Sequence, residues 1–243
     1  MESHQENSYG ERIAGIYDDL YSKYEEAEIT TLHELAQGGR ALELGIGTGR
    51  IALPLQRMGV EVHGIDASDA MVSKMRTKPG GESIPVALGN FADVPVDGDY
   101  ALIYVLFNTF YALLTQEEQI RCFQNVCNHL GSTGVFAIEA FVPDLTRYQG
   151  DQAIRVIHIG ANEVRIDASQ LDPESQQITS QHILLSEQGI RLYPVKLRYV
   201  WPAEFDLMAR LAGMRLKHRW SSWEKANFSA ESGKHISVYE RAP

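Results

Sequence analysis

The sequence predicts an α/β protein built on a doubly wound, parallel sheet with helices on both faces. Over the first 140 residues, short β-type runs alternate with segments long enough for helices, which is typical of such a sheet. A glycine-rich turn follows the first of these runs. Beyond residue 150 the helices stop and consecutive strand-like runs follow, which predicts an antiparallel β insert.

The composition is that of a globular protein and excludes several classes. The 243 residues are 44% hydrophobic and 22% charged, enough to bury one sizeable core, so collagen-like, coiled-coil and disordered chains are excluded. Lys and Arg total 22 against 32 Asp and Glu. The net charge of −10 argues against nucleic acid and anionic lipid surfaces as partners.

No segment is apolar enough to span a membrane. The longest apolar stretch, Tyr100–Leu114, is interrupted by Asn108 and Thr109 and falls short of the roughly 20 residues that a bilayer requires. The polar, acidic start of the chain lacks the features of a secretory signal. The spacing of Cys122 and Cys127 suits neither a local disulfide nor a thiolate metal pair. We therefore expect a cytoplasmic protein.

The elements of the predicted sheet follow in order along the chain. Apolar residues recur at helical spacing from Glu11 to Gln37 and stop at Gly38, which predicts one or two helices ahead of the sheet. Further helices are expected at Gly49–Met58, Ser68–Thr77 and Gln116–Leu130. Strands are expected at Ala41–Leu44, Val60–Ile65, Ile84–Leu88, Tyr100–Leu106 and Gly134–Phe141.

The later part of the chain predicts hairpins and then a short closing unit. Pro202 can start a helix that runs to Leu211, and Gly213 ends it. Strands at Arg215–Trp220 and Ile236–Glu240 would close the fold. The hairpin strands before them are expected at Ala153–Ile159, Asn162–Leu171, Gln177–Glu187 and Ile190–Trp201.

One segment of the sequence indicates a ligand-binding site, the run Glu43-Leu44-Gly45-Ile46-Gly47-Thr48-Gly49. It follows a strand and opens a helix, so its glycines allow a tight turn and let a ligand approach bare backbone. A dinucleotide fingerprint has its third glycine one place later and aims amides at a pyrophosphate, beside which Glu43 would be unfavourable. Asp66 ends the second strand, where a carboxylate can accept both hydrogen bonds of a ribose diol. The pattern favours a positively charged ligand of the adenosine type.

Together with Gly89-Asn90-Phe91-Ala92-Asp93, these residues resemble the class I S-adenosylmethionine-dependent methyltransferases, over nearly the whole chain. The resemblance implies a Rossmann-like methyltransferase sheet with S-adenosyl-L-methionine (SAM) as cofactor. It implies Glu43 and Gly45 at the amino-acid end of the cofactor and Asp66 at its ribose. The residues expected around the adenine are Ala67, Met71, Asn90 and Phe91. The full set of expected cofactor residues is Tyr17, Glu43, Gly45, Ile46, Gly47, Thr48, Gly49, Asp66, Ala67, Met71, Asn90 and Phe91.

A narrower resemblance adds an expectation about the acceptor. Ile16-Tyr17-Asp18-Asp19-Leu20-Tyr21, Phe107-Asn108-Thr109-Phe110-Tyr111 and the insert are similar to bacterial N-methyltransferases that act on amino groups of deoxysugars. We therefore expect a single methyltransferase domain in four parts. These are an N-terminal helical lid (1–38), a cofactor-binding core (39–150), an antiparallel acceptor-side insert (151–201) and a closing helix and strands (202–243).

Two side chains are candidates for a catalytic role. Tyr17 could belong to a lid over the sulfonium, because aromatic faces favour a cation and exclude water. Glu139 lies at the C-terminal edge of the fifth strand, where it could orient an acceptor amine or hydroxyl. For both, simple packing is the alternative. Zinc, Walker and serine-nucleophile patterns are absent from the sequence, so no metal is expected.

We expect methyl transfer from SAM to a small-molecule acceptor by direct displacement. A neutral amine needs no strong base whereas a hydroxyl profits from one, so the lack of an obvious base motif favours an amine, such as an amino sugar or natural-product intermediate. Small-molecule O-methylation is the alternative within this class. A nicotinamide oxidoreductase and a non-catalytic cofactor-binding domain are the alternatives outside it. A homodimer stays open as a further partner.

Overall fold

The computed structural model describes residues 8–21 and 23–243, and it confirms the expected α/β class. Seven strands form one mixed sheet in the order β10-β11-β5-β4-β1-β2-β3. Strands β1 to β5 run parallel, whereas β11 is antiparallel to both β5 and β10. The strands are β1 Ala41–Leu44, β2 Val62–Asp66, β3 Val86–Leu88, β4 Tyr100–Val105, β5 Leu130–Phe141, β10 Met214–Trp220 and β11 Lys234–Arg241.

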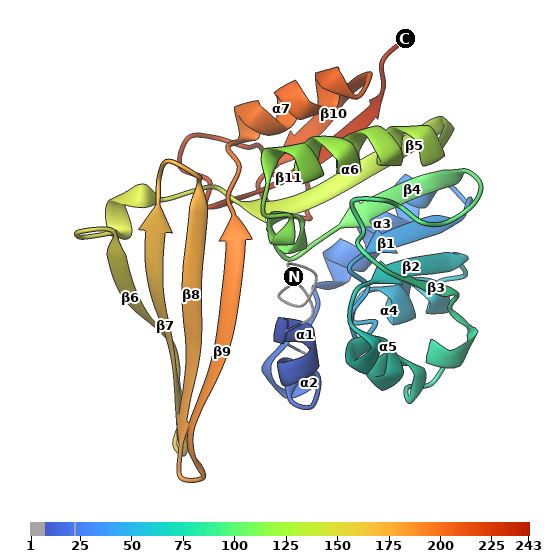
Figure 1. Ribbon diagram of the computed structural model, residues 1–243. Helices are drawn as coiled ribbons and strands as arrows, with labels where there is room; N and C mark the ends of the chain where they lie inside the picture. The colour runs from blue at the N-terminus through green and yellow to red at the C-terminus, as the bar shows by residue number, and fades with distance from the viewer. Residues whose placement is uncertain (1–7, 22) are drawn as a thin grey trace.

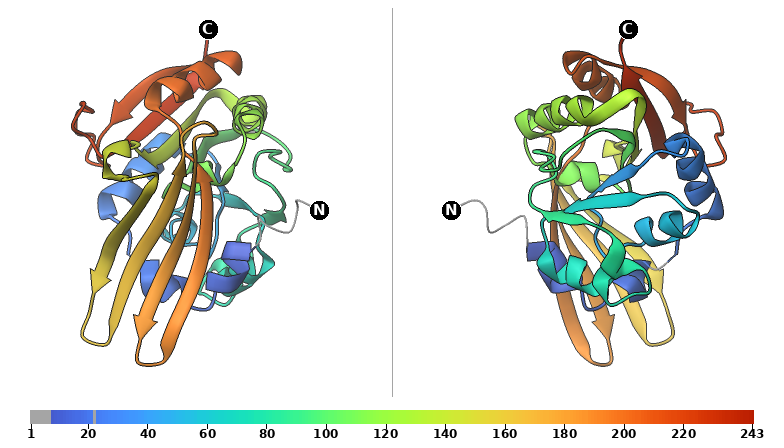
Figure 2. Two further views of the ribbon diagram at one scale, coloured as in Figure 1. Left: turned by 60° about the vertical axis from the view of Figure 1, so that its left-hand side comes forward. Right: turned by 90° about the vertical axis from the view of Figure 1, so that its right-hand side faces the viewer.

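Helices cover both faces of this sheet (Figures 1 and 2). On one face, α6 and α7 bury Phe123 and Phe205 in a shared core. On the other face, α3, α4 and α5 bury Leu32, Leu55 and Val72. The helices are α1 Ser8–Ile13, α2 Tyr17–Tyr21, α3 Glu26–Ala36, α4 Ala52–Arg57, α5 Asp69–Arg76, α6 Gln116–His129 and α7 Pro202–Leu211, with short 3-10 turns η1 Gly81–Ser83, η2 Thr109–Ala112 and η3 Leu145–Arg147. In the part of the chain that the structure describes, no helix is long and apolar enough to cross a membrane.

Local sequence explains where the helices begin. Ser68 caps α5, since its hydroxyl accepts a hydrogen bond from the Met71 amide at 3.3 Å. Thr115 and Glu118 form a capping box at the start of α6, which satisfies two backbone amides that the helix leaves free. Pro202 occupies the first turn of α7, where its missing N–H is not needed.

The N-terminal region departs most from the expected elements. One or two helices are expected between Glu11 and Gln37, but the described residues of this region form three, and α1 already begins at Ser8. The chain leaves the helical path after Ile13, and α3 restarts at a new cap. There the Glu25 amide donates to the Glu28 carboxylate at 3.4 Å, and the Glu25 side chain accepts in return.

Two further boundaries also need correction. The helix expected from Gly49 begins only at Ala52, because Gly49 has φ +74°, a left-handed conformation that cannot start a right-handed helix. Strand β5 begins at Leu130 rather than Gly134, because the chain passes directly from α6 into the sheet and Leu130 pairs with Tyr100.

The expected insert is a separate four-stranded antiparallel sheet in the order β6-β7-β8-β9. Its strands are β6 Gln152–Ile159, β7 Glu163–Asp172, β8 Gln177–Ser186 and β9 Gly189–Arg198. One face of this sheet packs on the N-terminal helices, where Tyr193 and the partly buried Leu184 join Ile13 in a small apolar cluster. Figure 1 shows that the insert sheet lies to one side of the main sheet, next to α1 and α2.

Candidate active site

A cavity of about 650 Å³ lies at the carboxyl ends of β1, β2 and β4, the edge at which open α/β sheets bind ligands. Its remaining walls come from α1, α2, the start of α5, the segment after β3, the η2 turn and strands β8 and β9. Eleven of the twelve expected cofactor residues line this cavity, and Gly49 is the exception. The structure therefore gathers on one surface the residues that the sequence places in separate turns.

The glycine turn brings bare backbone to the cavity. The amides of Gly45 and Ile46 both donate to the Ile65 carbonyl, at 2.8 and 3.0 Å, which holds the turn against β2. Gly45 has φ +73°, and a Cβ there would meet Thr109 Cγ2 at 2.5 Å. Gly49 serves packing on the far side of the turn, where a Cβ would meet Met75 Cγ at 2.7 Å. Gly45 thus needs glycine for close approach at the cavity, and Gly49 needs it for helix packing.

Asp66 closes the end of β2 with its carboxylate already oriented. Oδ2 accepts a hydrogen bond from the Gly47 amide at 2.7 Å, and Oδ1 accepts one from the Ser68 amide at 2.8 Å. Burial raises the pKa of Asp66 above its ordinary value, although these amides oppose the rise. Each carboxylate oxygen keeps acceptor capacity beyond these amides, so Asp66 can still accept from a diol.

Glu43 is a buried acid at the end of β1. The Tyr104 hydroxyl donates to Glu43 Oε2 at 3.0 Å. Burial nevertheless raises the pKa of Glu43 to about 8. Arg50 is the cavity cation that opposes this rise, and its Nη1 lies 3.6 Å from Glu28 Oε2. A cationic ligand group beside Glu43 would restore its charged form.

The N-terminal helices are tied to the glycine turn by polar contacts. The Thr48 hydroxyl donates to Asp18 Oδ1 at 2.6 Å, and Lys78 Nζ bridges the Asp18 carboxylate and the Thr48 carbonyl. The Ser68 hydroxyl donates to Glu11 Oε1 at 2.9 Å. These contacts place Tyr17, which lies in α2, against the cavity.

The residues expected around an adenine lie together beyond Asp66. Ala67, Met71, Asn90 and Phe91 all line the cavity. Asn90 Oδ1 accepts a hydrogen bond from the Ala92 amide at 2.8 Å, which fixes the side chain after β3. The placement agrees with the expected adenine surface, whose role in binding stays a prediction.

Glu139 does not line the cavity. Its Oε2 accepts from the Phe107 amide at 3.2 Å and its Oε1 from Lys234 Nζ at 2.9 Å. The Glu139 carbonyl also accepts from the Asn108 amide at 3.2 Å. These contacts hold the Phe107–Asn108 segment, where both residues have positive φ. The catalytic role expected for Glu139 stays a prediction, and its contacts fit a positioning role for the cavity wall.

Sequence reasoning missed several lining residues. Arg50 follows the glycine turn directly and stacks over the Phe107 ring, with 5.0 Å from Cζ to the ring centroid. Its position beside the motif is a signal that could have found it. The insert contributes Thr179, Pro194, Val195 and Lys196, and α1 adds Arg12. Strand alternation alone does not reveal which part of an insert faces the site.

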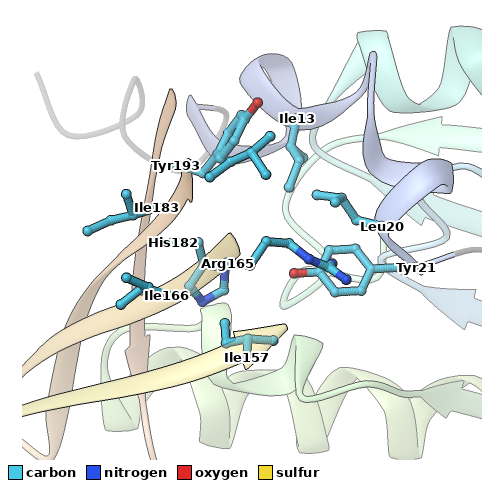
Figure 3. Close-up of a pocket in the computed structure, with 10 residues that line it drawn as sticks. Ile13, Leu20, Tyr21, Ile157, Arg165, Ile166, His182, Ile183 and Tyr193 are labelled. Carbon is cyan, nitrogen blue, oxygen red and sulfur yellow. The ribbon is translucent and has the colours of Figure 1, made fainter. Parts of the chain in front are cut away.

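A second, much smaller cavity of about 20 Å³ lies between the N-terminal helices and the insert (Figure 3). Tyr21, Arg165, His182 and Tyr193 line it with aliphatic neighbours. Its volume suits about one water molecule. It is too small for a ligand and lies at the contact between the N-terminal helices and the insert. Among the described residues, no group of three or more His, Cys, Asp or Glu side chains could hold a metal ion.

Comparison with known proteins gives consistent matches. A family model described as a methyltransferase domain matches residues 41–134. The structure of the CcbJ methyltransferase from Streptomyces caelestis has a TM-score of 0.90 and 37% identity, covering 98% of this chain and 100% of that chain. The cypemycin N-terminal methyltransferase from a Streptomyces species is 25% identical over 210 residues, 86% of each chain. SAM-bound CalS10 from Micromonospora echinaspora, an amino pentose methyltransferase, shares the fold with a TM-score of 0.69 and 17% identity, covering 93% of this chain and 97% of that chain.

These matches decide between the classes that the sequence leaves open. The glycine turn, the carboxylates at the ends of β1 and β2 and the cavity between them lie inside or beside the matched domain. The 37% identical relative extends the match to the insert and the closing strands. An oxidoreductase and a non-catalytic domain are therefore set aside. The chain belongs to the class I SAM-dependent methyltransferases and is an enzyme that uses SAM.

Proposed function

We propose that the protein methylates the amine nitrogen of a small molecule, such as an amino sugar or a related natural-product intermediate. Two relatives support an amine, since one is named for the N-terminus of cypemycin and the other for an amino pentose. Several kinds of amine fit this description. The chemistry of the cavity wall supplies the stronger argument.

The residues present fit SAM. In the proposal, Asp66 accepts from the ribose hydroxyls while the Gly47 and Ser68 amides hold its carboxylate. Glu43, whose pKa burial raises to about 8, gains a cationic partner in the amino group. Gly45 brings bare backbone to the cavity wall, where a side chain would collide with Thr109. Ala67, Met71, Asn90 and Phe91 provide the surface for the adenine.

The observation that carries the amine proposal is the kind of ionisable group in the cavity. Among the described residues that line it, these groups are two carboxylates, two phenols and three cations. Asp66 and Glu43 already accept hydrogen bonds. Burial raises the pKa of Tyr9, and it raises that of Tyr17 to about 12, so both phenols stay protonated at neutral pH. Among the lining residues that the structure describes, none is therefore a free base of the kind a hydroxyl acceptor profits from.

When bound, SAM supplies a methyl group already activated by its sulfonium, so the acceptor needs only a free lone pair. The protein's contribution is then to orient the acceptor and exclude water. Tyr17 and Phe107 present aromatic surface to the cavity. Thr179, Pro194 and Lys196 bring the insert to the acceptor side, and Glu139 holds the Phe107 amide in place.

A matched pair of acceptors tests the proposal. The purified protein is incubated with methyl-labelled SAM and either an amino sugar or the same sugar with a hydroxyl in place of the amine. Transfer of label to the amine and not to its hydroxyl analogue is the expected result. Labelling of hydroxyl acceptors, with no labelling across a panel of primary and secondary amines, would show that the protein is an O-methyltransferase.

A further inference from the structure

Strand β9 contributes its backbone edge to the active-site cavity. Among the described strands it pairs only with β8, and Figure 1 shows it on the side of the insert that faces α1 and the main sheet. Pro194, Val195 and Lys196 all line the cavity although they are consecutive. Side chains of consecutive strand residues point to opposite faces, so what these three residues share at the cavity is the edge of the backbone.

The hydrogen-bond register decides which backbone groups of β9 point to the cavity. In an antiparallel pair, residues alternate between those whose N–H and C=O face the neighbouring strand and those whose N–H and C=O face away. The Tyr199 amide donates to the Gln176 carbonyl at 2.9 Å, at the position that continues the β8–β9 pairing beyond Arg198. The odd-numbered residues of β9 therefore face β8 and the even-numbered ones face away. Pro194 fits this register, because it has no N–H to donate to β8.

A hydrogen bond at the end of the same edge agrees with this direction. The Arg198 carbonyl, on an even-numbered residue, accepts from Gln119 Nε2 at 3.2 Å, and Gln119 belongs to α6 on the main sheet. Two residues earlier, Lys196 directs its N–H and C=O to the same side, and Pro194 directs its C=O there. No other described residue hydrogen-bonds to these three groups. Within the described chain, the cavity wall thus offers one backbone donor and two backbone acceptors that have no partner.

We propose that the acceptor carries its amine on a peptide-like unit, which adds to the edge of β9 as a short extra strand. The proposal rests on methyl transfer to an amine and names the kind of molecule that bears this amine. A residue placed opposite Lys196 donates its N–H to the Lys196 carbonyl and accepts from the Lys196 N–H through its own carbonyl. In an extended chain the backbone groups of the preceding residue point the opposite way. An amine on that preceding residue therefore faces away from β9, into the cavity.

The residues of this edge restrict what pairs with it. Proline and lysine on an edge strand ordinarily discourage pairing with strands of other proteins. Pro194 has no N–H, so a residue opposite it gains one hydrogen bond at most. Among the described residues of β9 that line the cavity, Lys196 alone offers both a donor and an acceptor. A unit as short as a dipeptide uses both groups, whereas an amino sugar without an amide has no N–H and C=O spaced to match them.

Paired acceptors test the proposal on the full chain. Methyl-labelled SAM is supplied with a panel of dipeptide amides that differ in their side chains. Each is paired with the depsipeptide that has an oxygen in place of the central N–H. We expect label on the amino group of the dipeptides and a kcat/KM about tenfold lower for the depsipeptides, because the ester cannot donate to the Lys196 carbonyl. Equal kcat/KM values within the pairs overturn the proposal, as does labelling only of amines that lack an amide.

Proline variants test the same contact from the side of the protein. Lys196→Pro removes the cavity-facing N–H and keeps the β8–β9 hydrogen bonds, because that N–H faces away from β8. We expect its KM for the dipeptide to be about tenfold above that of Lys196→Ala, which loses the side chain but keeps the N–H. Leu192→Pro is the matched control and is expected to keep the KM of the wild type. Leu192 also faces away from β8 but does not line the cavity.

The outcomes separate this inference from the proposed function. Equal KM values of Lys196→Pro and Lys196→Ala for the dipeptide, with SAM affinity unchanged in both, show that the edge does not bind the acceptor. If Lys196→Pro does not fold, the paired acceptors decide alone. Labelling of hydroxyl acceptors and of no amine overturns methyl transfer to an amine, and this inference with it. Equal use of dipeptides and depsipeptides overturns this inference only.

Discussion

The main sheet and the insert use apolar residues in opposite ways. In the parallel part, Leu42, Ile65 and Ile103 are fully buried between helices on two faces. In the insert, Ile154, Ile159 and Ile190 are among the most exposed aliphatic side chains of the described chain. The main sheet completes its own core, and the cavity lies at the carboxyl ends of its strands. The insert supplies one wall of the cavity and leaves these apolar side chains exposed, so changes in the two regions should have different consequences.

The largest effect is expected from Asp66→Ala at the edge of the main sheet. If Asp66 makes two charge-assisted hydrogen bonds to the ribose, their loss weakens SAM binding by about 3 kcal/mol, or roughly 100-fold. Titration calorimetry measures the change. Asp69→Ala, an exposed aspartate at the start of α5, is the matched control and should leave the affinity unaltered. Equal SAM affinities of Asp66→Ala and Asp69→Ala would show that Asp66 does not bind the cofactor.

A glycine pair compares the two regions directly. Gly45 and Gly189 both have positive φ, but a Cβ meets Thr109 at 2.5 Å in the first and nothing within 4 Å in the second. Gly45→Ala therefore adds a steric clash to backbone strain, and we expect a loss of about 2 to 3 kcal/mol in unfolding free energy, against about 1 kcal/mol for Gly189→Ala. Chemical denaturation measures both.

The clash at Gly45 can be separated from its strain. Thr109→Ser removes the methyl group that a Cβ at Gly45 would meet. Adding Thr109→Ser to Gly45→Ala should recover part of the lost stability, whereas the same addition to Gly189→Ala should not. Equal losses for the two alanine variants would mean that close approach at the turn is unimportant.

The buried acid Glu43 predicts a pH dependence. Its folded pKa of about 8 lies above the ordinary 4.5, so the protein favours the protonated acid, and stability falls as pH rises from about 4.5 to about 8. A cationic group bound beside Glu43 favours the ionised form. SAM affinity should therefore rise towards pH 8, by at most about tenfold per pH unit, with a proton released on binding.

Glu43→Gln is the control for this linkage, because the amide keeps the shape of the side chain without a titratable proton. Calorimetry in two buffers of different ionisation enthalpy counts the released protons. If Glu43→Gln keeps the wild-type dependence of SAM affinity on pH, that dependence belongs to another group. Glu28, whose pKa burial raises to about 7, is then the first candidate.

The smallest effect is expected from Lys78→Met, which removes a contact between α2 and the glycine turn. Lys78 Nζ lies 2.9 Å from Asp18, but both side chains are partly exposed, so the pair contributes no more than about 1 kcal/mol to stability. Because the pair holds α2 at the cavity, KM for SAM should rise a few-fold. Lys225→Met breaks an exposed pair with Glu34 away from the cavity and should leave KM as it is. Identical KM values for Lys78→Met and the wild type would show that the Lys78–Asp18 contact does not affect SAM binding.

Much of the fold could be predicted because its signals are local. The alternation of strands and helices, the Ser68 cap and the Pro202 start all depend on a few adjacent residues. The break between α1 and α3 could not be predicted, since apolar spacing continues across it and only the capping box at Glu25 marks where α3 begins. The sequence also does not show which face of the insert sheet packs on the N-terminal helices, because period-two alternation defines two faces without distinguishing the buried one.

The candidate site shows the same limit. The glycine turn and Asp66 are recognisable because their chemistry depends on neighbouring residues, and the structure places them at one cavity. Glu139 sits at the expected strand edge but turns to Phe107 and Lys234, contacts that join segments 32 and 95 residues apart. Lys196 reaches the cavity through the packing of a separate sheet. Contacts between residues so far apart in the sequence cannot be predicted from a local pattern.

Calorimetric titration of SAM at pH 8 into the wild type, Asp66→Ala and Val156→Glu/Leu192→Glu tests the account most directly. The double variant changes two exposed side chains of the insert that do not line the cavity. We predict saturable binding to the wild type, about 100-fold weaker binding to the Asp66 variant and unchanged affinity in the insert variant. Absence of SAM binding in the folded wild type, or a loss caused by the insert variant in place of Asp66→Ala, would contradict it.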